Sequence, residues 1–146
     1  MNSLRIKFYK FDKQFKSWLK KWGIPLTRIS LGVVFLWFGL LKVFNVSPVV
    51  DLISKTYWFL PTNEFIFFLG IWEVLVGIGL IFKLFLRTTL FFLWLQMLGT
   101  LTSLFLYPPM FFVSGNLFLL TMEGEFVVKN LVLIAAGLAI SGHEVD

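Results

Sequence analysis

Glu73 is the residue of this chain whose chemistry is hardest to accommodate. It lies near the centre of the apolar stretch 65–82 (FIFFLGIWEVLVGIGLIF), which is long enough to cross a bilayer core as a helix. A carboxylate at that depth costs about 2.5–3.5 kcal/mol on insertion scales, and intramembrane acids of this kind face protein or a cavity. Gly70 and Gly77 share its helical face, and glycine on a membrane helix marks the close approach of another helix. We therefore predict that Glu73 points into a helix bundle.

A buried carboxylate needs a cation or a hydrogen-bond donor, and three cations lie within the other apolar stretches. At about 1.5 Å per residue, Arg28 and Lys129 lie within side-chain reach of the depth of Glu73, from opposite sides. Lys42 lies about 12 Å from the centre of its own stretch, and we expect its ammonium to extend outward to the interface. The sequence thus predicts an ion pair of Glu73 with Lys129 or Arg28.

Two amides complete the predicted intramembrane polar network. Gln96 belongs to the polar stripe of the third apolar stretch, and Asn130 belongs to that of the fourth. The alternative is that Glu73 is protonated and is held by hydrogen bonds alone. The folded yield of a Glu73→Gln variant in detergent would separate these two interpretations, because only a buried ion pair is broken by that change.

The composition indicates a polytopic membrane protein. Of the 146 residues 58% are hydrophobic and only 14% are charged, which lies outside the range of soluble domains. We predict an all-α fold, an antiparallel bundle of four transmembrane helices whose small and polar stripes face a common interior. The expected spans are 24–44, 64–82, 86–107 and 126–141. A short helix is expected over 48–56. Residues 110–125 are expected to form a loop that is pressed against the outer membrane face or folded back over the bundle. The expected helix-packing glycines are Gly32, Gly39, Gly70 and Gly77.

Residues 1–22 form a separate, basic segment ahead of the bundle segment 23–146. Aromatic and leucine side chains recur there at alternating spacings of three and four, which predicts an amphipathic helix lying in the membrane interface. The sequence 23–25 (Gly-Ile-Pro) is expected to break this helix and turn the chain into the bilayer. The lysines expected to contact anionic headgroups are Lys7, Lys10, Lys13, Lys16, Lys20 and Lys21.

The distribution of positive charge predicts the orientation. Seven of the thirteen Lys and Arg residues lie in the first 21 residues, and Lys83 and Arg87 flank the turn between the second and third spans. Positive loops remain on the cytoplasmic side, so both termini are expected inside a bacterial inner membrane and the loops 45–63 and 108–125 outside.

Few residues of this chain could carry out catalysis. There is no cysteine and only one histidine, His143, which excludes thiol chemistry and an internal bis-histidine haem site. No nucleophile, base and orienting group occur together, so we predict no catalytic residues, no metal site and no independent enzymatic activity. No cofactor is predicted for the chain, although its polar interior is of a kind that could take a quinone.

Four short motifs follow one another along residues 24–142. They are Arg28-x-x-x-Gly32, Gly39-x-x-Lys42, Gly70-x-x-Glu73-x-x-x-Gly77 and Glu123-Gly124-Glu125-Phe126-x-x-Lys129-Asn130. In this order they resemble the DoxX-like family of small four-helix bacterial inner-membrane proteins. The resemblance implies a link to the small membrane subunit of thiosulfate:quinone oxidoreductase and to other membrane oxidoreductase assemblies. Members that handle disulfides rely on cysteines, which this chain lacks.

Three functions are compatible with these observations. The first is a non-catalytic membrane subunit or accessory protein that anchors or stabilises a larger complex, a redox-linked one if the resemblance extends so far. The second is a quinone- or lipid-binding module in which Glu73 handles protons. The third is an oligomeric transporter or channel. The predicted partners are anionic lipid headgroups and a protein of the same membrane, with no role for nucleic acid.

Overall fold

The computed structural model describes residues 3–145, and all of their regular elements are helical. Four stretches are long and apolar enough to cross a membrane: Lys7–Val43, Thr62–Ile81, Leu86–Leu106 and Met122–Glu144. Along the chain the helices are α1 (Ser3–Val43), α2 (Val50–Thr56), α3 (Thr62–Ile81), α4 (Leu86–Leu106), α5 (Met122–Val128) and α6 (Asn130–Glu144), with 3-10 turns at Pro108–Met110 and Val113–Gly115.

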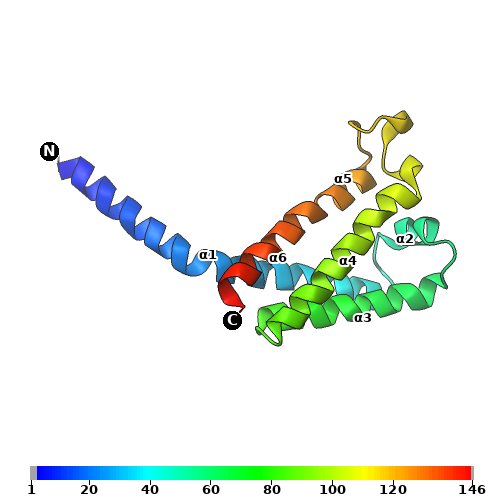
Figure 1. Ribbon diagram of the computed structural model, residues 1–146, viewed down its shortest axis with the longest axis horizontal. Coiled ribbons are helices and arrows are strands. Elements are labelled where there is room, and N and C mark those ends of the chain that lie inside the picture. Colours follow the sequence, from blue (N-terminus) through cyan, green and yellow to red (C-terminus); the bar gives the residue numbers. More distant parts are fainter. Residues whose placement is uncertain (1–2, 146) are drawn as a thin grey trace.

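The predicted break at residues 23–25 is wrong, because α1 is one continuous helix through Pro25. Proline removes a single backbone donor, which bends a helix without ending it. The hydroxyl of Thr27 donates a hydrogen bond of 2.8 Å to the carbonyl of Gly23, one turn before it. Figure 1 shows α1 bending between its N-terminal part, which projects away from the other helices, and the part that packs in the bundle.

The bundle is a closed ring of four neighbours. α1 packs against α3 and α6, and α4 packs between α3 and α6, so that the predicted four-helix bundle is confirmed (Figure 1). The turn between α3 and α4 is tight, with Lys83 and Phe85 in the left-handed backbone region. Between α4 and α6, the indole of Trp94 lies on Gly137, where a Cβ atom would come within 2.7 Å of its nitrogen.

Glycine brings the second half of α1 and the middle of α3 together. A Cβ atom at Gly32 would lie 2.9 Å from the carbonyl oxygen of Gly77, and one at Gly39 would lie 2.7 Å from that of Gly70. Such distances leave no room for a side chain at these positions. The two backbones therefore touch directly, as small residues allow in membrane helix pairs.

The fourth span begins earlier and ends later than the predicted 126–141. α5 and α6 meet at Lys129 and together cover Met122–Glu144. The hydroxyl of Thr121 accepts a hydrogen bond of 3.1 Å from the backbone N–H of Gly124 and so caps α5. Glu123 and Glu125 therefore belong to the first turn of a helix, where the helix dipole favours acids, and not to a loop.

The segment between α4 and α5 folds back over the bundle. Phe111 is completely buried and packs with Leu52 and Ile53 of α2, Ile66 of α3 and Val127 of α5. A second apolar cluster fills the opposite half of the bundle, towards the turn between α3 and α4. Its buried members are Leu31, Phe35, Val76, Leu80, Leu86, Leu90, Leu93, Met97 and Ile140.

Candidate functional site

A polar cluster made of three side chains lies inside the bundle. The ammonium of Lys42 is 2.6 Å from Oε2 of Glu73, and the side-chain amide of Gln96 donates a hydrogen bond to the other carboxylate oxygen. The three residues come from α1, α3 and α4, and each is 7–9% exposed. Gln96 and Lys42 thus supply the donors that make a buried carboxylate tolerable.

The prediction that Lys42 reaches the interface is therefore wrong, and the end of α1 explains why. The backbone N–H groups of Asn45 and Val46 bond to the carbonyls of Lys42 and Leu41, and Asn45 has a φ of 55°. This is a Schellman motif, which ends the helix. Gly70 lies opposite Val43, eight residues into α3. α1 thus ends about 12 Å short of the start of α3, and Lys42 lies opposite Gly70, within one helical turn of Glu73.

Neither cation that was predicted to pair with Glu73 does so. Arg28 lies at the other end of the bundle, where it pairs with Glu144 and donates to the carbonyls of Leu80 and Ile81 at the end of α3. It thereby ties α1, α3 and the end of α6 together.

Lys129 lies at the junction of α5 and α6 and faces outward. Its ammonium is 3.8 Å from the carboxylate of Glu125, in a pair whose side chains are 75% and 62% exposed. Such a pair contributes little to stability.

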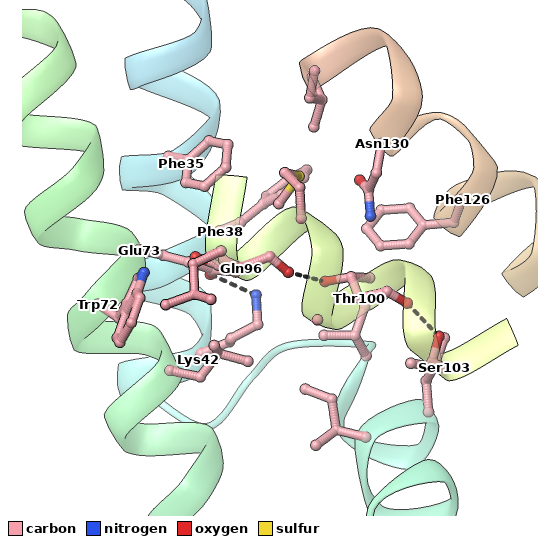
Figure 2. Close-up of a pocket in the computed structure, with 18 of the residues that line it drawn as sticks. Phe35, Phe38, Lys42, Trp72, Glu73, Gln96, Thr100, Ser103, Phe126 and Asn130 are labelled. Carbon is pink, nitrogen blue, oxygen red and sulfur yellow. Dashed lines mark hydrogen bonds and ion pairs between the residues drawn. The ribbon is translucent and has the colours of Figure 1, made fainter. Parts of the chain in front are cut away.

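A cavity of about 420 Å³ opens beside the polar cluster. Its volume lies within the range of small-molecule sites, and its walls are mostly apolar and aromatic. Figure 2 shows Phe35, Phe38 and Trp72 on one side of it and Phe126 on the other. The cavity lies between the two apolar clusters, since residues of both contribute to its lining. Tyr57, the C-cap residue of α2, also lines the cavity, and its hydroxyl donates a 2.7 Å hydrogen bond to the carbonyl of Gly99.

Asn130 contributes a polar side chain to the wall of the cavity opposite the polar cluster. It is 6% exposed, it lines the cavity, and Figure 2 draws no hydrogen bond between its amide and the other residues shown. Thr100 and Ser103 also line the cavity, but their hydroxyls donate within α4, to the carbonyls of Gln96 and Thr100. The amide of Asn130 is therefore available to a bound molecule.

The cavity can bind and orient a molecule, and the ionisable pair of Lys42 and Glu73 lies beside it. Among residues 3–145, no group of three or more His, Asp or Glu side chains could hold a metal ion. Of the residues predicted for the network, Glu73 and Gln96 are in contact, whereas Asn130 lies on the opposite wall of the cavity. The roles of Lys42 and Tyr57 were not predicted. The sequence does contain a signal for the end of the first helix, which sets the position of Lys42. Asn45 tolerates the left-handed conformation, and it is followed by Ser47-Pro48.

The DoxX family model matches residues 23–108, which is more than half of the chain. The match covers the bundle part of α1 together with α2, α3 and α4, and it includes Lys42, Glu73 and Gln96. Asn130 and the fourth span follow the matched region. Neither the curated proteins nor the solved structures gave a match. With four helices able to span a membrane and a family match over most of the bundle, the chain is a membrane protein that belongs to the DoxX family.

Proposed function

We propose that this chain binds an amphiphilic small molecule, a quinone or a lipid, within the membrane. The cavity beside Lys42, Glu73 and Gln96 carries this proposal, because it joins an apolar volume to buried polar groups. Membrane amphiphiles have the same two parts, a polar head and an apolar body.

The two polar walls support binding of the head group. The amide of Asn130 offers N–H donors to a carbonyl head group, and both its donors and its carbonyl acceptor to a hydroxyl head group. Across the cavity, the pair of Lys42 and Glu73 is the group that would handle protons if the head group were redox-active. Trp72, Phe38 and Phe126 offer faces and edges for an aromatic ring or an acyl chain.

Mass spectrometry of the molecules that co-purify with the protein tests this proposal. Quinones and lipids are quantified per mole of protein after mild detergent extraction, in the wild type and in a Thr100→Phe variant, which places a ring in the cavity. Thr88→Phe is the matched control, because Thr88 is exposed on the same helix and does not line the cavity. We expect one retained species in the wild type and the control, and its loss in Thr100→Phe.

A second, milder variant keeps this test independent of packing effects. Asn130→Leu removes the free amide at nearly constant volume, and it should reduce retention several-fold while leaving the protein folded. Equal amounts of every quinone and lipid in all four proteins would reject the proposed binding function. The chemical identity of the retained species shows whether the chain binds a quinone or a lipid.

A second candidate function is that of an accessory subunit of a larger membrane complex. Its support is a set of exposed apolar side chains at one end of the bundle. Leu117 and Phe118, in the loop before α5, and Met122, the first residue of α5, are 70%, 93% and 85% exposed. Apolar side chains of this kind at a loop tip favour contact with a partner or with lipid. Replacing all three with serine should release a stoichiometric partner after mild extraction. An unchanged set of co-purified proteins argues against this candidate.

We also propose a bacterial inner-membrane location with both termini in the cytoplasm. The lysine-rich start of α1 and the Lys83/Arg87 turn support it, because positive segments stay on the cytoplasmic side. Single cysteines at Asn116 and Lys83 can be tested with an impermeant maleimide on spheroplasts, because the chain has no other cysteine. Labelling at Asn116 alone is expected, and labelling at Lys83 alone would reverse the orientation.

A further inference from the structure

The first half of α1, residues 3–22, is a helix that the bundle does not cover. We refer to it as the N-terminal arm. From Lys7 to Trp22 every residue except Asp12 is exposed, and Figure 1 shows the arm projecting away from the other helices. This half of α1 also precedes the family match, which begins at residue 23.

One face of the arm is a continuous aromatic strip. Phe8, Phe11, Phe15, Trp18 and Trp22 fall within an arc of about 80° at the rotation of an α-helix. The rings of Phe11 and Phe15 are stacked with centroids 6.2 Å apart, and the ring of Trp18 follows at 6.5 Å from Phe15. These side chains are 45–75% exposed, so the strip is an apolar surface without a cover.

The rest of the circumference is strongly positive. Its only acid within residues 7–22 is Asp12, which pairs with Lys16 at 2.8 Å. The exposed lysines are Lys7, Lys10, Lys13, Lys16, Lys20 and Lys21. A second copy of the N-terminal arm would pack poorly on the aromatic strip, because contact between two such strips would bring two rows of lysines together. An anionic lipid surface matches both halves, because it offers acyl chains to the rings and phosphates to the lysines.

The length of α1 requires a bend for this contact. Its 41 residues would make a straight rod of about 62 Å, against a hydrocarbon core of roughly 30 Å, so an unbent arm would stand in water. Residues 23–27 can supply the bend. Pro25 has no backbone N–H, the Thr27 hydroxyl bonds to the carbonyl of Gly23, and no heavy atom lies within 4 Å of a Cβ built at Gly23.

We propose that the N-terminal arm folds at residues 23–27 onto an anionic bilayer surface, with its aromatic strip in the acyl boundary and its lysines among phosphate headgroups. This docking is independent of the cavity and of any molecule bound there.

Site-directed spin labelling of the full chain tests the proposal, since the protein has no cysteine of its own. A nitroxide is attached to Phe11→Cys, on the strip, or to Lys13→Cys, on the charged face. The proteins are placed in nanodiscs of phosphatidylcholine alone or of phosphatidylcholine and phosphatidylglycerol in equal parts. Collision rates are measured with oxygen, which concentrates in lipid, and with a neutral nickel chelate, which remains in water.

In anionic discs we expect the ratio of oxygen to nickel collisions to be several-fold higher at position 11 than at position 13. The ratio at position 11 should fall several-fold in discs of phosphatidylcholine alone. Equal ratios at the two positions in anionic discs would overturn the proposal. Protection of position 11 from both reagents in both lipids would also overturn it, because this would indicate a protein cover.

A separate variant tests the bend at residues 23–27. Gly23→Ala with Pro25→Ala restores the helix ladder without a steric clash at residue 23, and it should return position 11 to water in anionic discs. An unchanged lipid signal at position 11 in this variant would show that residues 23–27 are not the point of bending. Lys129, which is exposed outside the arm, provides a control label whose collision ratio should not change.

Discussion

Lys42 faces Gly70, three residues before Glu73, and Glu73 in turn faces Gly39, three residues before Lys42. A Cβ atom at Gly70 would lie 2.9 Å from Cβ of Lys42, and one at Gly39 would lie 2.9 Å from Cβ of Glu73. The motifs Gly39-x-x-Lys42 and Gly70-x-x-Glu73 thus form a reciprocal unit on two antiparallel helices. The glycines set the closeness of the backbones, and this closeness brings the two charges to 2.6 Å.

The first prediction concerns the stability of this pair. Lys42→Met should destabilise the protein by about 3–5 kcal/mol, because it leaves the carboxylate of Glu73 buried without its cation. The double variant Lys42→Met/Glu73→Gln should recover most of that loss. The measurement is the unfolding free energy in mixed detergent micelles.

A double-mutant cycle separates coupling from general damage in that experiment. Lys55→Met, on the last turn of α2 and outside the pair, serves as the matched substitution. The cycle includes the Glu73→Gln single variant. If the loss in the double variant equalled the sum of the losses in the two single variants, the two residues would not interact energetically.

The second prediction tests the glycine contact. Gly39→Ala should cost about 1–3 kcal/mol, because its methyl group would lie 2.7 Å from both the Gly70 carbonyl and the Val74 nitrogen. Gly99→Ala is the control within a span, since no heavy atom lies within 4 Å of its Cβ position. Alanine there should be neutral or stabilising by up to about 1 kcal/mol. Thermal unfolding in detergent would contradict the close contact if both variants shifted Tm equally.

The third prediction concerns Arg28, which joins α1 to the ends of α3 and α6. Arg28→Gln should destabilise the bundle by about 1.5–3 kcal/mol, because it removes hydrogen bonds to Glu144 and to the end of α3. Glu125→Gln breaks the exposed pair with Lys129, and it should change stability by less than about 0.5 kcal/mol. Proteolysis of the C-terminal residues gives a local readout, and cleavage should accelerate only in Arg28→Gln.

The fourth prediction concerns the attachment of α2. Tyr57→Phe removes one hydrogen bond to the carbonyl of Gly99 and should cost about 1 kcal/mol. Tyr9→Phe, at a position 68% exposed on the N-terminal arm, is the control and should have no measurable effect. Hydrogen exchange of α2 should increase in Tyr57→Phe alone, and a uniform increase across the bundle would contradict a local role.

Composition and spacing were sufficient to predict the fold. Long apolar stretches allow few structures in a bilayer, since every backbone polar group there must be satisfied within helices or closed barrels. The burial of Glu73 followed from the same constraint. The contacts of Gly70 and Gly77 with α1 could be anticipated because small residues let membrane helices approach.

The partner of Glu73 could not be predicted because it depends on where one helix ends relative to another. The prediction assumed that each helix crosses the membrane symmetrically, which placed Lys42 about 12 Å from the centre of the first span. The Schellman motif at Asn45 ends α1 early, and the contact of Gly39 with Gly70 sets the register. The continuity of α1 through Pro25 was missed for a related reason, since one absent donor bends a helix without stopping it.

The early end of α1 also has a consequence for biogenesis. Lys42 leaves the ribosome 31 residues before Glu73, so the insertion machinery meets an ammonium in the first hydrophobic segment without its counter-ion. Because the pair needs both helices, Lys42 gains its counter-ion only after α3 has been made. Gln96 follows later still, with α4, and adds a further hydrogen-bond donor to the carboxylate.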